Sequence, residues 1–479
     1  MKFSKILGAI GLLVLTAACS GSVGTTPAPG PSQSGAPPAS PIQHIVVLMQ
    51  ENRSFDNIFA GFPGADTTLV GKCLPAPDCK GSRIRLHSVP LESTGAPNRG
   101  TDIDHSHHGF EIECDANASH VCQMDGFNQI RFGESGTQGK AHSYPYAYAE
   151  RSETKPYWDL AKQYTLADEM FFTETASSFI AHQMIISGTV QLKKGEWVTD
   201  QPLAGPPWGC FSAPGNNAPI LFANGTVKGY PGVFPCFKWA TIADLLDAKG
   251  VSWLDYVDSG GKIAGGPPGA FDFSGGVWSG FGAIRKIYHG PDWKRNITFA
   301  NDQIFSDLTA KKLPAVSWVI PTLYDSDHPA SGCNGGPWWV TKVVDAIGES
   351  SYWNSTAVII IWDDWGGWYD NAPPKYFNPS TLGFRVGMIV ISPYARAGTV
   401  VHTQYDFGSI LKFQEQTFNL GSLGTTDASA ASMQDAFDFT QTPLKFKPEP
   451  LPSAMACKDK ITNPNDSDEI IKNAGGVPE

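Results

Sequence analysis

The sequence predicts an α/β protein built on a mostly parallel sheet. Short apolar runs alternate with segments of helical pattern along most of the chain, which is the order expected when helices connect parallel strands. The runs are apolar at successive positions, as in strands that are buried on both faces. With 479 residues, 41% of them hydrophobic, the chain can also bury a large core.

The first apolar run, residues 44–49 (HIVVLM), predicts a central parallel strand because both of its faces are apolar. The same pattern predicts further strands at residues 251–257, 315–320, 357–362 and 386–392.

Helix start and stop signals lie between these runs. We expect helices at residues 242–249, 337–348 and 407–420. The capping and stop residues that indicate them are Thr241, Gly250, Pro337, Gly348, Asp406 and Gly421.

Composition narrows the class of function. The chain has 50 glycines and 37 prolines, which indicates many loops between the elements. Its 35 Lys and Arg residues are outnumbered by 46 Asp and Glu residues, for a net charge of −11, and no basic stripe or repeat stands out. A nucleic-acid partner is therefore disfavoured.

The N-terminus has the pattern of an export signal. Two lysines precede an apolar run at residues 6–18 that is too short to span a bilayer. Residues 15–19 (LTAAC) are similar to a bacterial lipoprotein cleavage site, in which Cys19 would carry the lipid and anchor the chain to a membrane. Plain secretion after Ala18 is the alternative, because Thr16 stands where an aliphatic residue is usual.

The domain organisation follows from composition. Residues 20–41 are rich in Gly, Pro and Ser and predict a flexible linker. No second linker interrupts residues 42–445, which we expect to form one catalytic domain, with a polar C-terminal tail at residues 446–479.

Cysteine usage agrees with export, since thiols pair in oxidising compartments. Setting Cys19 aside leaves eight cysteines. Close spacing suggests three local disulfides and leaves a fourth couple, and the four expected pairs are Cys73 with Cys79, Cys114 with Cys122, Cys210 with Cys236, and Cys333 with Cys457. A zinc site is disfavoured because no pair of Cys-x-x-Cys spacings occurs.

Polar residues follow two of the expected strands. The first strand leads into Glu51 and Asn52, and the strand at 357–362 leads into Asp363 and Asp364. Adjacent carboxylates at the end of a buried strand repel each other unless a cation lies between them. Oxygen ligands alone favour Mg, Ca or Mn. A solvated turn with two surface aspartates is the other interpretation.

Histidines accompany acids at two further places. Residues 325–329 (DSDHP) follow the strand at 315–320 and carry His328, and residues 101–108 (TDIDHSHH) carry His105. Such histidines can steady a phosphoryl group and donate a proton to a leaving alcohol. Loop hydrogen bonds and adventitious metal binding are the plainer interpretations.

Two serines precede a helical run at residues 179–186. Ser177 or Ser178 can be its N-cap, which is the commoner role of a serine in this place. A serine oxygen at a helix start also lies near the positive end of the dipole, where a phosphate and an attacking alkoxide are favoured. No Gly-x-Ser-x-Gly element supports an esterase.

Over most of residues 42–440 the chain resembles a family of bacterial and plant phosphoesterases that includes non-specific phospholipases C and periplasmic acid phosphatases. The motifs that carry the resemblance are ENRSFD at 51–56, the stretch 178–189 ending in SGT, TIADLL at 241–246, GPDW at 290–293, SDHP at 326–329, YWNST at 352–356 and WDDWGG at 362–367. The resemblance implies an alkaline-phosphatase-like α/β fold, with helices on both faces of the sheet and long loop insertions.

The resemblance also implies roles for individual residues. One divalent metal ion would be held by Glu51, Asn52, Asp363, Asp364 and Ser178. Ser178 would be the nucleophile, since the family's hydroxyl residue lies eleven positions before the threonine of the SGT element, here Thr189. His105 and His328 would face the phosphate. One departure is that Ile180-Ala181-His182 stands where many relatives have Pro-Asn-Arg.

The expected function is that of an exported phosphoester hydrolase of phospholipase C type, acting on phospholipid diesters. An acid phosphatase acting on small phosphomonoesters is the alternative, and a non-catalytic envelope-binding lipoprotein is a third possibility. A sulfatase lacks support because the Ser178 segment has no Cys/Ser-x-Pro-x-Arg element. Five aromatic residues predict either a lipid-contacting rim or loop packing: Trp338, Trp339, Trp365, Trp368 and Tyr369.

Overall fold

The computed structural model describes residues 40–91, 102–133, 139–204, 208–257, 279–329, 334–375 and 382–452. The expected export signal, Cys19, most of the linker, both Cys333 and Cys457, and most of the tail lie outside these residues. Within the described part of the chain, no helix is long and apolar enough to cross a membrane.

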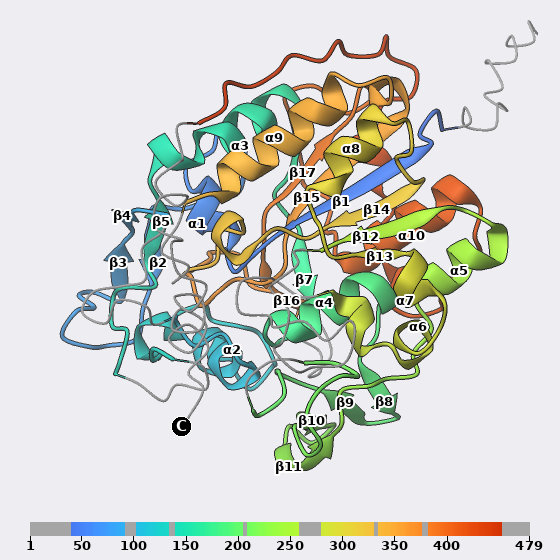
Figure 1. The fold of residues 1–479 in the computed structure, drawn as a ribbon. Helices are drawn as coiled ribbons and strands as arrows, with labels where there is room; N and C mark the ends of the chain where they lie inside the picture. The colour runs from blue at the N-terminus through green and yellow to red at the C-terminus, as the bar shows by residue number, and fades with distance from the viewer. Residues whose placement is uncertain are drawn as a thin grey trace, which may run out of the picture. The chain divides into compact units, whose positions relative to one another are not determined.

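An eight-stranded mixed sheet forms the centre of the fold (Figure 1). In spatial order its strands are β13 (Ile297–Thr298), β12 (Trp253–Tyr256), β14 (Val316–Val319), β1 (His44–Gln50), β15 (Thr356–Trp362), β17 (Met388–Ile391), β6 (Thr165–Ala167) and β18 (Thr399–Val401). Every residue of β15, and every residue of β1 except His44, is buried, as expected of a strand covered on both faces.

Strand β17 alone among these eight runs against the others. It pairs antiparallel with both β15 and β6, whereas the remaining neighbours in the sheet are parallel. The expectation that residues 386–392 form another parallel strand is therefore wrong in direction. A fully buried strand has the same apolar pattern in either direction, so the sequence pattern could not reveal this.

Helices cover both faces of the sheet, as expected. One layer contains α3 (Arg151–Gln163), α8 (Gln303–Thr309) and α9 (Gly336–Gly348), and the other contains α4 (Ser178–Ser187), α5 (Ile242–Lys249) and α10 (Phe407–Phe418) (Figure 1). Helix α5 has the expected bounds, with Thr241 in a capping box and Gly250 in the left-handed conformation. Helix α10 ends earlier than expected, because Asn419 with φ of 52° takes the left-handed position instead of Gly421.

Smaller elements extend from this core. A four-stranded sheet has the order β11 (Val227–Val233), β10 (Ala218–Phe222), β9 (Glu196–Val198) and β8 (Gln191–Lys193). Three two-stranded sheets pair β16 (Leu382–Arg385) with β7 (Phe171–Thr173), β2 (Val70–Lys72) with β3 (Arg83–Arg85), and β4 (His87–Val89) with β5 (Ala147–Ala149). The remaining short helices are α1 (Phe55–Phe59), α2 (His107–Cys114), α6 (Arg285–Tyr288), α7 (Asp292–Arg295) and α11 (Thr426–Ser429).

Among the described residues, three disulfides close loops around the core. Cys73 pairs with Cys79, Cys114 with Cys122, and Cys210 with Cys236. These three local pairs are the ones that sequence spacing predicts.

Candidate active site

Three adjacent parallel strands bring the expected site residues to one edge of the sheet. Strand β1 lies between β14 and β15 in parallel register, with Leu48 opposite both Val319 and Ile360. Since the carboxyl ends of parallel strands share an edge, the residues that follow them meet there. The amide of Glu51 donates to Ser326 O at 2.7 Å, and the amide of Asp363 donates to Gln50 O at 3.0 Å.

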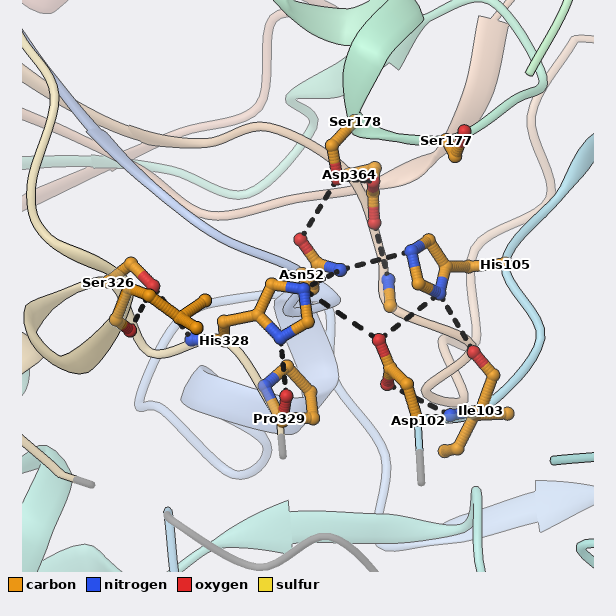
Figure 2. Close-up of polar contacts among 12 residues, drawn as sticks. Asn52, Asp102, Ile103, His105, Ser177, Ser178, Ser326, His328, Pro329 and Asp364 are labelled. Carbon is orange, nitrogen blue, oxygen red and sulfur yellow. Dashed lines mark hydrogen bonds and ion pairs between the residues drawn. The ribbon is translucent and has the colours of Figure 1, made fainter. Parts of the chain in front are cut away.

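Ser178, the first residue of α4, lies against this edge. Its Oγ is 2.9 Å from Asp364 Oδ2 and 3.2 Å from Asn52 Oδ1. Ser177 takes the N-cap position instead, and its hydroxyl donates to Gln201 Oε1 at 3.1 Å. Figure 2 shows the Ser178 side chain directed at Asn52, with Ser177 to one side. Only Ser178 therefore presents its oxygen to the acidic residues.

The Asn52 side chain connects Ser178 with both expected histidines. Its Nδ2 lies 3.0 Å from His105 Nε2 and 3.2 Å from His328 Nε2 (Figure 2). Each histidine has its Nδ1 at a backbone carbonyl, that of Ile103 or of Pro329. Because a carbonyl only accepts, Nδ1 carries the proton in both rings, and each neutral ring accepts one amide hydrogen of Asn52 at Nε2.

The three carboxyl groups beside Ser178 are completely buried. Burial raises the pKa of Glu51 and Asp363 to about 8 and the pKa of Asp364 to about 7. Neighbouring carboxylates add to this: Glu51 raises the pKa of Asp363, and Asp363 raises that of Asp364. Ionised acids so close together need a compensating positive charge.

The residues at this edge fit a divalent cation. Glu51 Oε2 and Asp363 Oδ2 are buried and accept no hydrogen bond from any described residue. Within the same residues, neither acid forms an ion pair with a lysine or an arginine. Buried carboxylate oxygens without a donor are costly unless a metal occupies their lone pairs. The oxygens available for one ion come from Glu51, Asn52, Ser178, Asp363 and Asp364.

Sequence reasoning assigned no role to His182, which lies among these acids. Its Nε2 is 2.9 Å from Glu51 Oε1 and 3.9 Å from Asp363 Oδ2. An imidazole nitrogen therefore lies beside the carboxylate oxygens at this edge. The spacing could have indicated that His182 belongs to the site, because it is four residues after Ser178 and residues four apart share a helix face.

Asp102 is a second residue whose role the sequence did not reveal. Its Oδ2 lies 3.6 Å from His105 Nδ1 and 3.8 Å from His328 Nε2 (Figure 2). Burial raises its pKa to about 7. By contrast, burial lowers the pKa of His328 to about 3. A carboxylate near both rings favours their protonated forms when it is ionised.

A close backbone approach at Gly366 and the hydrogen bonds of Asp327 position the loops around the site. Gly366 has φ of +61°, and a Cβ there would lie 2.1 Å from the carbonyl oxygen of Asn52, so only glycine permits this approach. Asp327, next to His328, accepts hydrogen bonds at Oδ2 from Tyr157 Oη at 2.7 Å and from Trp362 Nε1 at 3.1 Å.

The aromatic residues proposed as a lipid-contacting rim do not form one. Trp339, Trp365, Trp368 and Tyr369 are each at most 3% exposed, and only Trp338 is partly exposed. Trp365, for example, stacks on Phe172 and donates from Nε1 to Glu113 Oε2 at 2.6 Å. Trp365, Trp368 and Tyr369 pack their loop against its neighbours, which is the alternative interpretation, while Trp338 and Trp339 belong to helix α9.

The chain is similar in sequence to known phospholipases C. Over 456 residues the chain is 25% identical to phospholipase C A of Mycobacterium tuberculosis, covering 85% of this chain and 79% of that protein. It is 26% identical to non-specific phospholipase C1 of Arabidopsis thaliana over 86% of this chain and 74% of the relative.

Among solved structures, a protein in the alkaline phosphatase superfamily from Vibrio parahaemolyticus matches with a TM-score of 0.30 and 15% identity, covering 59% of this chain and 65% of that one. Residues 42–421 match the family model of the phosphoesterase family. The chain therefore belongs to the phosphoesterase family and is a hydrolase that acts on phosphoric ester bonds.

Proposed function

We propose that the chain is an exported hydrolase of phospholipase C type, which uses Ser178 as nucleophile with the assistance of one divalent cation. The observation that carries this proposal is the position of Ser178 Oγ, 2.9 Å from a buried carboxylate at the start of a helix. That position favours loss of the hydroxyl proton and approach of a phosphate.

The cation would be held by Glu51, Asn52, Ser178, Asp363 and Asp364. When bound, it supplies positive charge that lowers the pKa of the serine hydroxyl and offsets negative charge on the phosphoryl group. The support for it in this chain is the pair of buried carboxylate oxygens that lack hydrogen-bond donors.

The reaction proceeds in two displacements. Ser178 Oγ attacks phosphorus as its proton passes to Asp364, and the bond between phosphorus and the alcohol oxygen breaks. His105 or His328 takes up a proton from solvent at Nε2 when the phosphoryl group binds, and the alcohol departs with that proton. Water then attacks the phosphoseryl group, the histidine accepts a proton from that water, and Ser178 regains its own.

His105 has the better environment for proton donation. A bound phosphoryl group brings negative charge to Nε2 of both rings and favours their protonation. Asp102 Oδ2 lies near both rings and adds to that effect for each, but burial lowers the pKa of His328 to about 3. His328 then serves chiefly to hydrogen-bond the phosphoryl oxygens.

The proposed substrates are phospholipid diesters. The relatives from Mycobacterium tuberculosis and Arabidopsis thaliana are named phospholipases C, and this supports a diester substrate. An acid phosphatase that acts on monoesters is the second candidate. The burial of four of the five expected rim aromatics favours it, since that observation removes one reason to expect a lipid-contacting surface.

The test compares two substrates with the same purified protein. We expect release of phosphocholine from phosphatidylcholine in mixed micelles, at a higher kcat/KM than release of phosphate from glycerol phosphate. Turnover of the monoester alone would establish the acid phosphatase instead. If neither substrate is turned over when Mg²⁺, Ca²⁺, Mn²⁺ and Zn²⁺ are supplied in turn, the non-catalytic envelope-binding lipoprotein is the remaining interpretation.

The proposed location is the periplasm or cell envelope, with Cys19 as a lipid anchor. The three disulfides support an oxidising compartment. Cell fractionation of the wild type and of Cys19→Ala tests this: we expect the membrane fraction to lose the protein when Cys19 is replaced. Retention in the cytoplasm would refute export, and secretion of both forms would refute the anchor.

A further inference from the structure

His182 lies where a nitrogen ligand of the proposed cation would lie. It is on helix α4, one turn after Ser178, and its side chain is 1% exposed. Its Nε2 faces two carboxyl groups that are themselves at most 1% exposed, Oε1 of Glu51 at 2.9 Å and Oδ2 of Asp363 at 3.9 Å. The imidazole is thus enclosed with the acids and separated from solvent.

His182 cannot supply a hydrogen bond to every buried oxygen of Glu51 and Asp363. One N–H at Nε2 can serve only the nearer oxygen, Glu51 Oε1. Glu51 Oε2 and Asp363 Oδ2 still accept nothing from the described residues. Each of these three residues offers one ligand atom, and the three atoms lie within 4.8 Å of one another. Small side-chain movements bring three such atoms to the bond lengths of about 2.0–2.3 Å that N and O ligands make with a transition metal.

We propose that His182 Nε2 is a direct ligand of the cation, together with Glu51 and Asp363. The site would then contain one imidazole among oxygen ligands. Imidazole suits Zn²⁺, Cu²⁺, Fe²⁺ and Ni²⁺, while sites built from oxygens alone suit Mg²⁺ and Ca²⁺. The site therefore selects a transition metal over the alkaline-earth ions. This inference rests on the proposed function, because it concerns the same cation.

The first test detects the bond itself. Protein loaded with Mn²⁺, which accepts both oxygen and imidazole ligands, is examined by pulsed EPR for coupling to an imidazole nitrogen. We expect the coupling in the wild type and its loss in His182→Gln. Glutamine keeps an N–H that can donate to Glu51, so the substitution removes the ligand nitrogen while preserving the hydrogen bond.

Matched control variants show which histidine supplies the nitrogen that couples to Mn²⁺. His44→Gln removes an imidazole at the first residue of β1, which is the opposite end of the strand from Glu51, and should leave the coupling unchanged. His105→Gln and His328→Gln test the two other histidines nearby. Bound Mn²⁺ without nitrogen coupling in the wild type, or coupling that persists in His182→Gln, overturns the proposal even if a variant folds poorly.

The second test measures selectivity without reference to activity. Equilibrium dialysis of the wild type should show tighter binding of Zn²⁺ than of Mg²⁺. In His182→Gln the affinity for Zn²⁺ should fall by at least about tenfold while that for Mg²⁺ changes little. Equal losses for both ions would mean that His182 only positions Glu51. Wild-type protein that binds none of these ions yet keeps full activity would instead refute the proposed function.

Discussion

The Ser178 hydroxyl and the Asp364 carboxylate lie 2.9 Å apart although 186 positions separate them in the sequence. One begins helix α4 and the other follows strand β15. Asn52, which follows β1, accepts from the same hydroxyl at 3.2 Å and reaches both His105 and His328. Asn52 therefore connects the Ser178 hydroxyl, which also contacts Asp364, with both histidines.

The two histidines should respond differently to the leaving group. If His105 donates the proton, His105→Gln should lower kcat by about 10²–10⁴-fold on substrates with alkyl leaving groups. The loss should be much smaller on p-nitrophenyl esters, because that leaving group departs without a proton. His328→Gln should slow both substrates to a similar extent. The assignment of the proton donor is wrong if the two variants show the reverse pattern.

Replacement of Gly366 tests the close approach of two loops. In Gly366→Ala the new Cβ would lie 2.1 Å from the carbonyl oxygen of Asn52 at a φ of +61°. We expect kcat/KM to fall at least tenfold, because Asn52 must move.

Gly250→Ala is the matched control for this substitution. Its φ is +67° with no atom within 4 Å of the new Cβ. It should cost about 1–2 kcal/mol in the free energy of unfolding and leave kcat/KM unchanged. Equal kinetic effects of the two substitutions would count against a role for the loop contact.

Tyr157 is predicted to position His328 through Asp327. Tyr157→Phe removes the hydrogen bond of 2.7 Å to Asp327 Oδ2, so the free energy of unfolding should fall by about 1.5–3 kcal/mol. The kcat should fall as well, with little change in KM.

Tyr256→Phe provides the comparison for Tyr157→Phe. It removes a similar bond of 2.9 Å to Asp307 Oδ2, elsewhere on the sheet. It should lower stability without lowering kcat. A variant of Tyr157 that unfolds more easily but keeps full kcat would show a purely structural role.

Removal of the cation should make stability depend on pH. In the metal-free protein, folding raises the pKa of Glu51 and Asp363 to about 8 and of Asp364 to about 7. Between pH 6.5 and 8 the folded state then binds more protons than the unfolded state, so stability falls as pH rises. This pH range lies above the ordinary pKa of histidine. Titration of buried histidines would make stability rise with pH, but at lower pH.

Urea unfolding at pH 6.5, 7.2 and 8.0, with chelator or with added Mn²⁺, measures this dependence. We expect the stability gained from Mn²⁺ to increase with pH, and Asp363→Asn to reduce the slope of the chelated protein. Stability of the chelated protein that rises over this range would contradict the account.

Elements with strong local signals were predictable from the sequence. Strands β1 and β15 are long apolar runs, and helix α5 has both a cap and a glycine stop. Strands β6, β13 and β18 have three residues or fewer and leave no comparable pattern. Their places depend on contacts with the rest of the sheet.

The candidate site was predictable where polar residues follow strands. Glu51 and Asp363 are conspicuous for that reason, since each lies just after an apolar run. His182 is in a helix whose ten residues are all buried, so it resembles a core position unless its spacing from Ser178 is considered. The burial of Trp365 and Trp368 was not predictable. A tryptophan in a loop gives the same sequence pattern whether its side chain is packed or exposed.

Ser178 is the proposed nucleophile, and the turnover of Ser178→Ala compared with that of Ser177→Ala tests this role most directly. Both serines are buried at the start of α4, but only Ser178 contacts Asp364. On p-nitrophenyl phosphate and on phosphatidylcholine, Ser178→Ala should lose at least about 10³-fold in kcat, with unchanged thermal unfolding. Ser177→Ala should stay within a few-fold of wild type. Wild-type turnover by purified Ser178→Ala would contradict the account.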